Sequence, residues 1–164
     1  MEDLLNTKTH PSSLNPKPRV ITVANQKGGV GKTTTAINIA TCLAEMGNEV
    51  LVVDFDPQAN ATSALGVDPG SFSTSIYEVI LENAEMHECI IKTEWPSLSL
   101  APANSDLSGA EIELVAAFNR ERFLKTAIES VISEYDYVFI DCPPSIGLLT
   151  INALTAAGEV LVPI

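Results

Sequence analysis

Short, nearly continuous apolar runs are the most regular feature of the hydrophobic pattern. They occupy residues 20–24, Val50–Asp54, Leu98–Ala101 and Tyr137–Asp141, and a further run begins near residue 158. Runs of this length, bounded by turn residues, are typical of strands buried on both faces of a parallel sheet. We therefore expect a sheet whose strands are separated by helical stretches.

The stretches between these runs carry helical periodicity. Between residues 32 and 46 the small and apolar side chains Ala36, Ala40, Leu43 and Ala44 fall on one helical face, and Gly47 is placed to end the helix. Further helices are expected near residues 75–81, from about 104, and over 120–133. A strand, a helix and a strand in this order form a right-handed parallel unit. The expected fold class is α/β, a mostly parallel sheet flanked by helices.

The two ends of the chain differ from the middle. Residues 1–18 contain prolines and serines without apolar periodicity, so we expect a flexible N-terminal tail followed by one domain over 19–164. The chain stops at Ile164, just after its last expected strand and without a following helix. We therefore expect this domain to be truncated at its C-terminal side.

Composition and charge argue against a membrane protein and against DNA binding by this segment. No apolar run approaches the roughly 20 residues of a membrane span, and the acidic N-terminus lacks the features of an export signal, which predicts a cytoplasmic protein without membrane contact. The formal net charge is −12, and no Lys or Arg occurs between Lys32 and Lys92. Binding to nucleic acid normally needs a basic surface, so this segment is not expected to bind DNA itself.

The cysteines do not indicate a disulfide or a structural zinc site. Cys42, Cys89 and Cys142 show no C-x-x-C spacing and occur in a chain without an export signal. Cys42 lies within the first helical pattern, and we expect it to be a small core residue.

A glycine-rich segment after the first apolar run carries the clearest chemistry. Residues 25–34 read Asn-Gln-Lys-Gly-Gly-Val-Gly-Lys-Thr-Thr, between a predicted strand and a predicted helix. The glycines allow successive backbone N–H groups to turn toward a polyphosphate, and the helix N-terminus adds its positive dipole end. Lys32 would contact the β- and γ-phosphates, and the Thr33 hydroxyl would ligate Mg²⁺. The expected phosphate-binding residues are Lys27, Gly28, Gly29, Val30, Gly31, Lys32, Thr33 and Thr34.

Acidic residues follow the second and later apolar runs. Asp54 and Asp56 are two positions apart after residues 50–53, so on a continuing strand both carboxylates would point to the same side, toward the crevice at the carboxyl edge of the sheet. One could serve the metal shell while the other orients the attacking water. Asp141 ends another strand and is expected to hold Mg²⁺, with the loop 143–147 as a segment that senses the γ-phosphate.

These motifs resemble the ParA/Soj-type partition ATPases, which belong to the deviant P-loop class together with MinD. The resemblance covers nearly all of 19–164 and rests on KGGVGKTT at 27–34, DFDPQANAT at 54–62, PANSDLSGAEIEL at 102–114 and DCPPSIGLLTINAL at 141–154. The first Gly of the common P-loop pattern is replaced by Gln26, and Lys27 occupies the place of the family's extra lysine.

The resemblance implies a function and a role for each matching residue. ATP and Mg²⁺ are the implied cofactors, with Thr33, Asp54 and Asp141 around the metal. Asp56 is implied as the acid that positions water, and Lys27 as a catalytic lysine that reaches the nucleotide of a partner copy. The implied partners are a second copy of the chain in an ATP-dependent homodimer, a ParB-type protein and, in a complete protein associated with the nucleoid, nonspecific DNA.

Other functions are compatible with the same loop. A MinD-like positioning ATPase would share it, and so would a nucleotide-binding fragment without turnover. Electron transfer by an iron–sulfur relative would require paired cysteines at a dimer axis, which the cysteine spacing does not favour.

Overall fold

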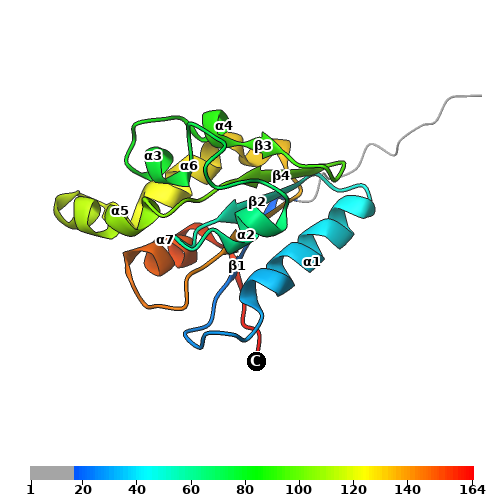
Figure 1. Cartoon of the computed structure of the whole chain (residues 1–164), viewed down its shortest axis with the longest axis horizontal. Coiled ribbons are helices and arrows are strands. Elements are labelled where there is room, and N and C mark those ends of the chain that lie inside the picture. Colours follow the sequence, from blue (N-terminus) through cyan, green and yellow to red (C-terminus); the bar gives the residue numbers. More distant parts are fainter. Residues whose placement is uncertain (1–16) are drawn as a thin grey trace, which may run out of the picture.

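The computed structural model describes residues 17–164, so nearly all of the predicted tail over 1–18 lies outside the described residues. Strands form one sheet in the order β3-β4-β2-β5-β1-β6 (Figure 1). Their bounds are β1 Arg19–Val23, β2 Val50–Asp54, β3 Ile91–Lys92, β4 Leu98–Ala101, β5 Tyr137–Asp141 and β6 Glu159–Leu161. All paired strands are parallel except β3, which runs antiparallel to β4 at the edge. The predicted α/β class with a mostly parallel sheet is confirmed.

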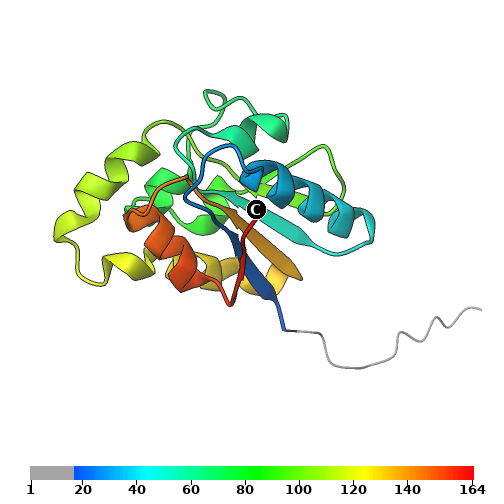
Figure 2. The same cartoon turned by 90° about the horizontal axis from the view of Figure 1, so that it is seen from below.

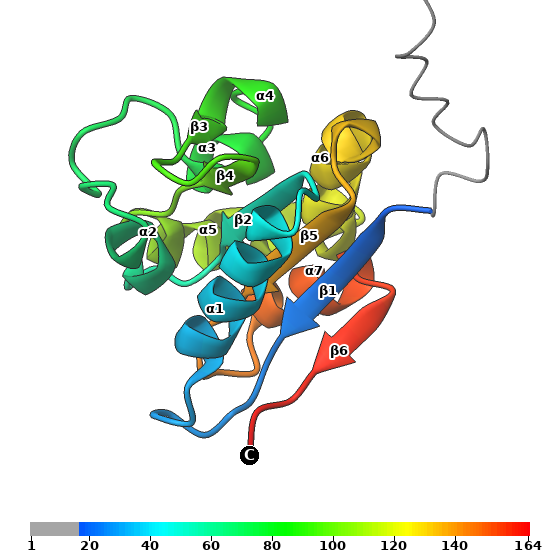
Figure 3. The same cartoon turned by 90° about the vertical axis from the view of Figure 1, so that its right-hand side faces the viewer.

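The strand register aligns the ends of the central strands. Asp54 at the end of β2 pairs with Asp141 at the end of β5, and Asp141 pairs in turn with Val23 at the end of β1. The labelled strands β2, β5 and β1 lie side by side in Figure 3. Because they are parallel, the loops that follow them emerge from one edge, where ligands of open α/β sheets bind.

Helices cover both faces of the sheet (Figure 2). The α-helices are α1 Lys32–Glu45, α2 Asn60–Ala64, α3 Ile76–Ile80, α4 Met86–Cys89, α5 Leu107–Glu113, α6 Phe123–Val131 and α7 Leu148–Ala156. Short 3₁₀ turns occupy Leu114–Ala116, Arg120–Arg122 and Ile132–Glu134.

The buried side chains form a core on each face of the sheet. On one face, α1 and α2 pack against alternate residues of the strands, including Val23, Val52 and Phe139. On the other face, α3 to α7 pack against the intervening residues, including Leu51 and Val138. Continuous apolar strands are therefore explained by burial on both sides, as the hydrophobic pattern predicts.

One expectation about an individual side chain is wrong. Cys42 is exposed rather than part of the core, because it lies on the outward face of α1. The helix α7 was not expected from the sequence, and it accounts for the connection between β5 and β6.

Candidate nucleotide-binding site

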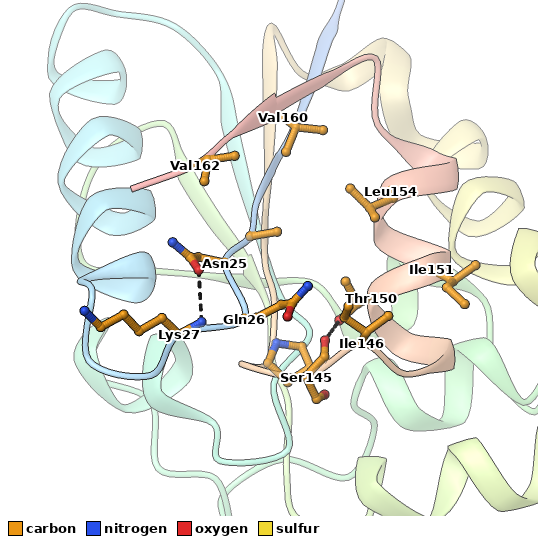
Figure 4. A pocket seen from close by; sticks show the side chains of 12 residues that line it. Asn25, Gln26, Lys27, Ser145, Ile146, Thr150, Ile151, Leu154, Val160 and Val162 are labelled. Atoms are coloured by element: carbon orange, nitrogen blue, oxygen red, sulfur yellow. Dashed lines mark hydrogen bonds between the residues drawn. The ribbon is translucent and has the colours of Figure 1, made fainter. Parts of the chain in front are cut away.

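The loop between β1 and α1 has the backbone of a phosphate-binding turn. Gly29 and Gly31 take positive φ angles of 73° and 82°, a region that residues with a Cβ rarely adopt. Asn25 supports the entry to this loop, because its Oδ1 accepts a 2.9 Å hydrogen bond from the Lys27 N–H and its Nδ2 donates a 2.8 Å bond to the Pro163 carbonyl (Figure 4). The loop is thus held at its base while its glycine-rich tip is exposed.

The N-terminus of α1 is open toward the loop. The residue preceding the helix is Gly31, and no side chain accepts a hydrogen bond there, nor does the first turn contain an acidic residue. Free N–H groups and the positive end of the helix dipole therefore face the glycine loop, as an anion requires.

The lysines of the loop differ in their surroundings. Lys32 is buried, with 7% of its surface exposed, and its Nζ donates a 3.4 Å hydrogen bond to the Lys27 carbonyl across the loop. The Lys27 side chain is exposed. The structure thus buries Lys32 within the phosphate turn and leaves Lys27 accessible at its surface.

Asp141 lies next to the first turn of α1. The Thr33 hydroxyl donates a 2.6 Å hydrogen bond to Oδ2 of Asp141, while Oδ1 is buried and has no hydrogen-bond partner among the described residues. The pKa of Asp141 is raised to about 7, mainly by burial and also by the nearby charges of Asp54 and Asp56, while the Thr33 hydrogen bond and the Lys32 charge act to lower it.

The surroundings of Asp141 fit a hard divalent cation. A hydroxyl oxygen and a carboxylate with an unpartnered oxygen are the kinds of donors that Mg²⁺ prefers, and a buried acceptor without a donor needs compensation. Among residues 17–164, no group of three or more His, Cys, Asp and Glu side chains could hold a metal ion alone. A cation here would therefore depend on further oxygens, such as those of a phosphate.

Asp54 is the last residue of β2 and Asp56 lies two residues beyond it, and their side chains have different environments. Asp54 is fully buried, and its carboxylate accepts hydrogen bonds from the backbone N–H groups of Asp56 and Thr62 and from the Thr62 hydroxyl. Burial raises the pKa of Asp54 to about 6 despite these bonds. Asp56 is 6% exposed, and its Oδ1 accepts a 2.9 Å bond from the Gln58 N–H. The expected arrangement of both acids on a continuing strand is wrong, because β2 ends at Asp54.

Most of the predicted site residues lie together at the carboxyl ends of β1, β5 and β2. Four of them are near enough to Asp141 to shift its pKa: Lys32, Thr33, Asp54 and Asp56. Lys27 lies at the exposed rim of the loop. Gly28 and Thr34 are exposed, and Val30 is half-buried beside the glycines.

Some residues that shape the site were missed. Thr62 anchors the segment after Asp54, and Glu111 of α5 accepts a 3.3 Å hydrogen bond from the Leu149 N–H at the start of α7. Asn25, directly before the glycine loop, could have been recognised from its position. Thr62 and Glu111 could not have been recognised in this way. Thr62 contacts Ala103, which is distant in the sequence, and Glu111 contacts the first turn of a helix that was not predicted.

A hollow of about 480 Å³ opens beside the loop. Its lining combines polar groups of residues 25–27 with the exposed apolar side chains Ile146, Ile151, Leu154 and Val162 (Figure 4). The loop 143–147, which was predicted to sense the γ-phosphate, forms one wall of this hollow through Pro143, Ser145 and Ile146. The loop, the segment and α7 therefore share one surface.

Two of the three cysteines are buried, and the exposed one, Cys42, lies on α1. Cys142 follows Asp141, and burial raises the pKa of its thiol; in α4, burial raises the pKa of Cys89 to about 12. A cluster bridging two copies of the chain would need paired accessible thiolates, so this arrangement does not favour electron transfer.

The helices of the described residues are too short or too polar to cross a bilayer, and none qualifies as a transmembrane segment.

Comparison with known proteins identifies the relatives of the chain. The family model AAA_31, described as AAA domain, matches residues 18–164. The sporulation initiation inhibitor protein Soj of Bacillus subtilis is 50% identical over 146 residues, which cover 89% of this chain and 58% of that protein. The chromosome partitioning protein ParA of Myxococcus xanthus is 51% identical over 146 residues, covering 89% of this chain and 52% of ParA.

A solved structure agrees in fold and in sequence. The cobyrinic acid a,c-diamide synthase of Mycobacterium smegmatis, with bound ADP and magnesium, superimposes with a TM-score of 0.87 at 48% identity, covering 90% of this chain and 60% of that one. The chain thus spans between about half and three fifths of the length of these relatives.

Proposed function

The chain belongs to the AAA_31 family of AAA domains, and from this premise we propose that it binds Mg·ATP and hydrolyses it as a switch in chromosome or plasmid partition. The observation that carries the proposal is the hydrogen bond between Thr33 and Asp141 directly beside the glycine loop, with one Asp141 oxygen left unpartnered. The names of the relatives Soj and ParA support the partition context, and the bound ADP and magnesium of the Mycobacterium structure support the ligand.

The glycine loop and α1 would bind the phosphates. N–H groups of residues 28–31 and the open end of α1 donate to phosphate oxygens, with the amide of Thr34 extending the same row. Within residues 17–164 the Lys32 ammonium makes one hydrogen bond, to the Lys27 carbonyl at 3.4 Å, a long bond that a phosphate oxygen could replace. Replacement of a weak contact by a charge-assisted one favours binding.

Thr33 and Asp141 would hold the metal. Mg²⁺ supplies neutralisation of the charge on the β- and γ-phosphates. The hydrogen bond between Thr33 and Asp141 is made by the chain itself, so the hydroxyl and the carboxylate are oriented toward one another by the fold. This preorganisation reduces the cost of assembling the site.

Asp56 would orient the attacking water. Its Oδ1 is held by the Gln58 N–H, so the side chain has a fixed direction, while Oδ2 has no donor among the described residues. A carboxylate held by one oxygen can accept a proton or a hydrogen bond from water with the other, which is the role required for hydrolysis.

Lys27 would act on a second copy of the chain. Its ammonium is exposed and free of the loop it belongs to, whereas its carbonyl supports Lys32. In an ATP-dependent homodimer this lysine would reach the partner's nucleotide and add positive charge to the transferring phosphate.

Protein and DNA partners are proposed for a longer protein that contains this chain. A ParB-type protein would stimulate hydrolysis, and nonspecific DNA would bind to the dimer at the nucleoid in the cytoplasm. Because the formal net charge is −12 and an acidic protein repels a polyanion, we do not propose that these residues bind DNA themselves.

Titration of the chain with a fluorescent ATP analogue, with and without Mg²⁺, tests the proposal, together with release of inorganic phosphate from ATP. We expect saturable binding that tightens with Mg²⁺, and slow phosphate release. Absence of binding would contradict the proposal. Tight binding without phosphate release would instead support a nucleotide-binding segment without turnover.

A further inference from the structure

Both oxygens of the Asp54 carboxylate accept hydrogen bonds from the chain itself. Oδ1 accepts a 3.2 Å hydrogen bond from the Asp56 N–H, and Oδ2 accepts bonds of 2.7 Å each from the N–H and the hydroxyl of Thr62. Both Asp54 and Thr62 are completely buried. Breaking these bonds to free an oxygen for a metal would leave buried donors unsatisfied, which costs about 1–3 kcal/mol for each group.

Thr62 extends this contact to a second strand. Its hydroxyl has a single proton, which it donates to Asp54, and its oxygen accepts a 3.0 Å hydrogen bond from the Ala103 N–H. Ala103 follows β4, so the chain of bonds joins the ends of β2 and β4 to the first turn of α2. The direction of the Thr62 hydroxyl is fixed by having a donor on one side and an acceptor on the other.

The segment between Asp54 and Thr62 carries Asp56. At its start, the Phe55 N–H donates a 2.9 Å bond to the Asp141 carbonyl, and in its middle the Ala59 N–H donates a 2.9 Å bond to the Asp56 carbonyl. Ala59 has a φ of 52°, which a residue with a Cβ adopts only when its surroundings require it. The segment is therefore a closed turn held at both ends by the Asp54 carboxylate.

Asp54 and Asp141 contrast directly, although they are paired in register on neighbouring strands. Asp141 retains a buried oxygen without a donor, whereas Asp54 has none to spare. We propose that Asp54 is a positioning residue rather than a metal ligand, and that it acts with Thr62 to fix the turn that aims Asp56 at the attacking water. This inference rests on the proposed function and replaces the metal role that the family resemblance implies for Asp54.

Variants of the chain separate the positioning role from the metal role. Asp54→Asn and Thr62→Val weaken the hydrogen bonds between residues 54 and 62, which we call the clamp. Thr62→Ser keeps the side-chain hydroxyl, and Asp141→Asn serves as the metal-site comparison. The readouts are the Mg²⁺ concentration that half-saturates binding of a fluorescent ATP analogue, the rate of phosphate release, and amide hydrogen exchange over residues 55–62. Thermal unfolding shows which variants are folded.

If Asp54 is a positioning residue, the Mg²⁺ concentration that half-saturates nucleotide binding stays within about twofold of the parent in Asp54→Asn and in Thr62→Val. Their turnover falls by about 10- to 100-fold at unchanged nucleotide affinity, since small misplacements of a reacting group are costly. The double variant loses little more than either single one, because both act on the same clamp. Exchange over 55–62 accelerates in both, and Thr62→Ser restores turnover and slow exchange.

Two outcomes would overturn the inference. In the first, Asp54→Asn raises the Mg²⁺ concentration that half-saturates nucleotide binding by about tenfold or more, as expected for Asp141→Asn. Such an increase would identify Asp54 as a metal ligand. The other is parental turnover and parental exchange in both Asp54→Asn and Thr62→Val. If Asp54→Asn does not fold, the Thr62→Val and Thr62→Ser pair decides. A parent that binds no nucleotide contradicts the proposed function itself, a result distinct from both.

Discussion

The Thr33 hydroxyl and the Asp141 carboxylate are joined by a 2.6 Å hydrogen bond that links the first turn of α1 to the end of β5. The two residues are far apart in the sequence, but β1, whose loop leads to Thr33, and β5, which ends at Asp141, have their carboxyl ends at the same edge of the sheet. This contact makes the phosphate loop and the segment after β5 parts of one site.

We predict that Asp141→Asn raises the Mg²⁺ concentration needed for nucleotide binding by about tenfold or more, because the amide is a poorer metal ligand. In the absence of ligands the same variant should unfold at a higher temperature, with a gain of about 1 kcal/mol, since a buried charge with an unpartnered oxygen is removed. Metal titration and thermal unfolding check the two effects. A variant with lower stability and unchanged Mg²⁺ dependence would contradict the assignment.

Lys32→Ala should weaken nucleotide binding by about 100-fold or more, because it removes the buried ammonium that we propose contacts the phosphates. Lys125→Ala on α6 is the matched control, since it removes the same charge far from the loop. Titration with a fluorescent ATP analogue measures both. Equal affinities in the two variants would show that Lys32 does not contact the phosphates.

Asp56→Ala should keep nucleotide affinity close to the parent and reduce phosphate release by about 100-fold or more, as expected when the group that orients water is removed. Asp68→Ala, an exposed aspartate in the turn after α2, controls for the loss of a negative charge. Hydrolysis at the parental rate in Asp56→Ala would make the proposed role of Asp56 wrong.

Lys27→Ala should leave nucleotide binding by a single chain close to the parent, since the Lys27 side chain is exposed, whereas Lys32 is the lysine buried in the loop. ATP-dependent association of two copies should be lost in this variant. Light scattering in the presence of a slowly hydrolysed ATP analogue measures association. A dimer that forms as readily in Lys27→Ala as in the parent would contradict the action of Lys27 across copies.

Gly147→Ala should destabilise the segment between Asp141 and α7. A Cβ at position 147 would overlap the Glu111 carboxylate, which would have to leave its hydrogen bond with the Leu149 N–H. The expected loss is about 1 kcal/mol, the usual value of an acceptor at a helix N-terminus. Denaturant unfolding measures it, with Glu111→Ala as the comparison. Equal losses in both single variants and in the double variant would support this mechanism, and additive losses would exclude it.

Features encoded within a few neighbouring residues could be predicted from the sequence. The strand Val50–Asp54 and the helix Lys32–Glu45 follow from local periodicity, and the glycine loop between residues 28 and 31 follows from its spacing. The proximity of Thr33 to Asp141 was expected because parallel strands bring their carboxyl ends to one edge.

Features that depend on distant partners could not be predicted. Helix α7 was missed because Leu149 and Ala153 are buried while Ile151 and Leu154 are about half-exposed, so its sequence is apolar all round and lacks helical periodicity. The turn at Asp54 was read as a continuing strand because its termination depends on Thr62 and Ala103. The outward position of Cys42 follows from which face of α1 meets the sheet.

The strand order has a consequence for how the protein folds. β1, which leads into the phosphate loop, pairs only with β5 and β6, and these strands come more than a hundred residues later in the chain. When the chain is synthesised from its N-terminus, the phosphate loop emerges early but has no strand beside it until nearly all of these residues have been made. Contacts of such long sequence separation form slowly. The earliest motif in the sequence is therefore among the last parts of the molecule to acquire its native surroundings.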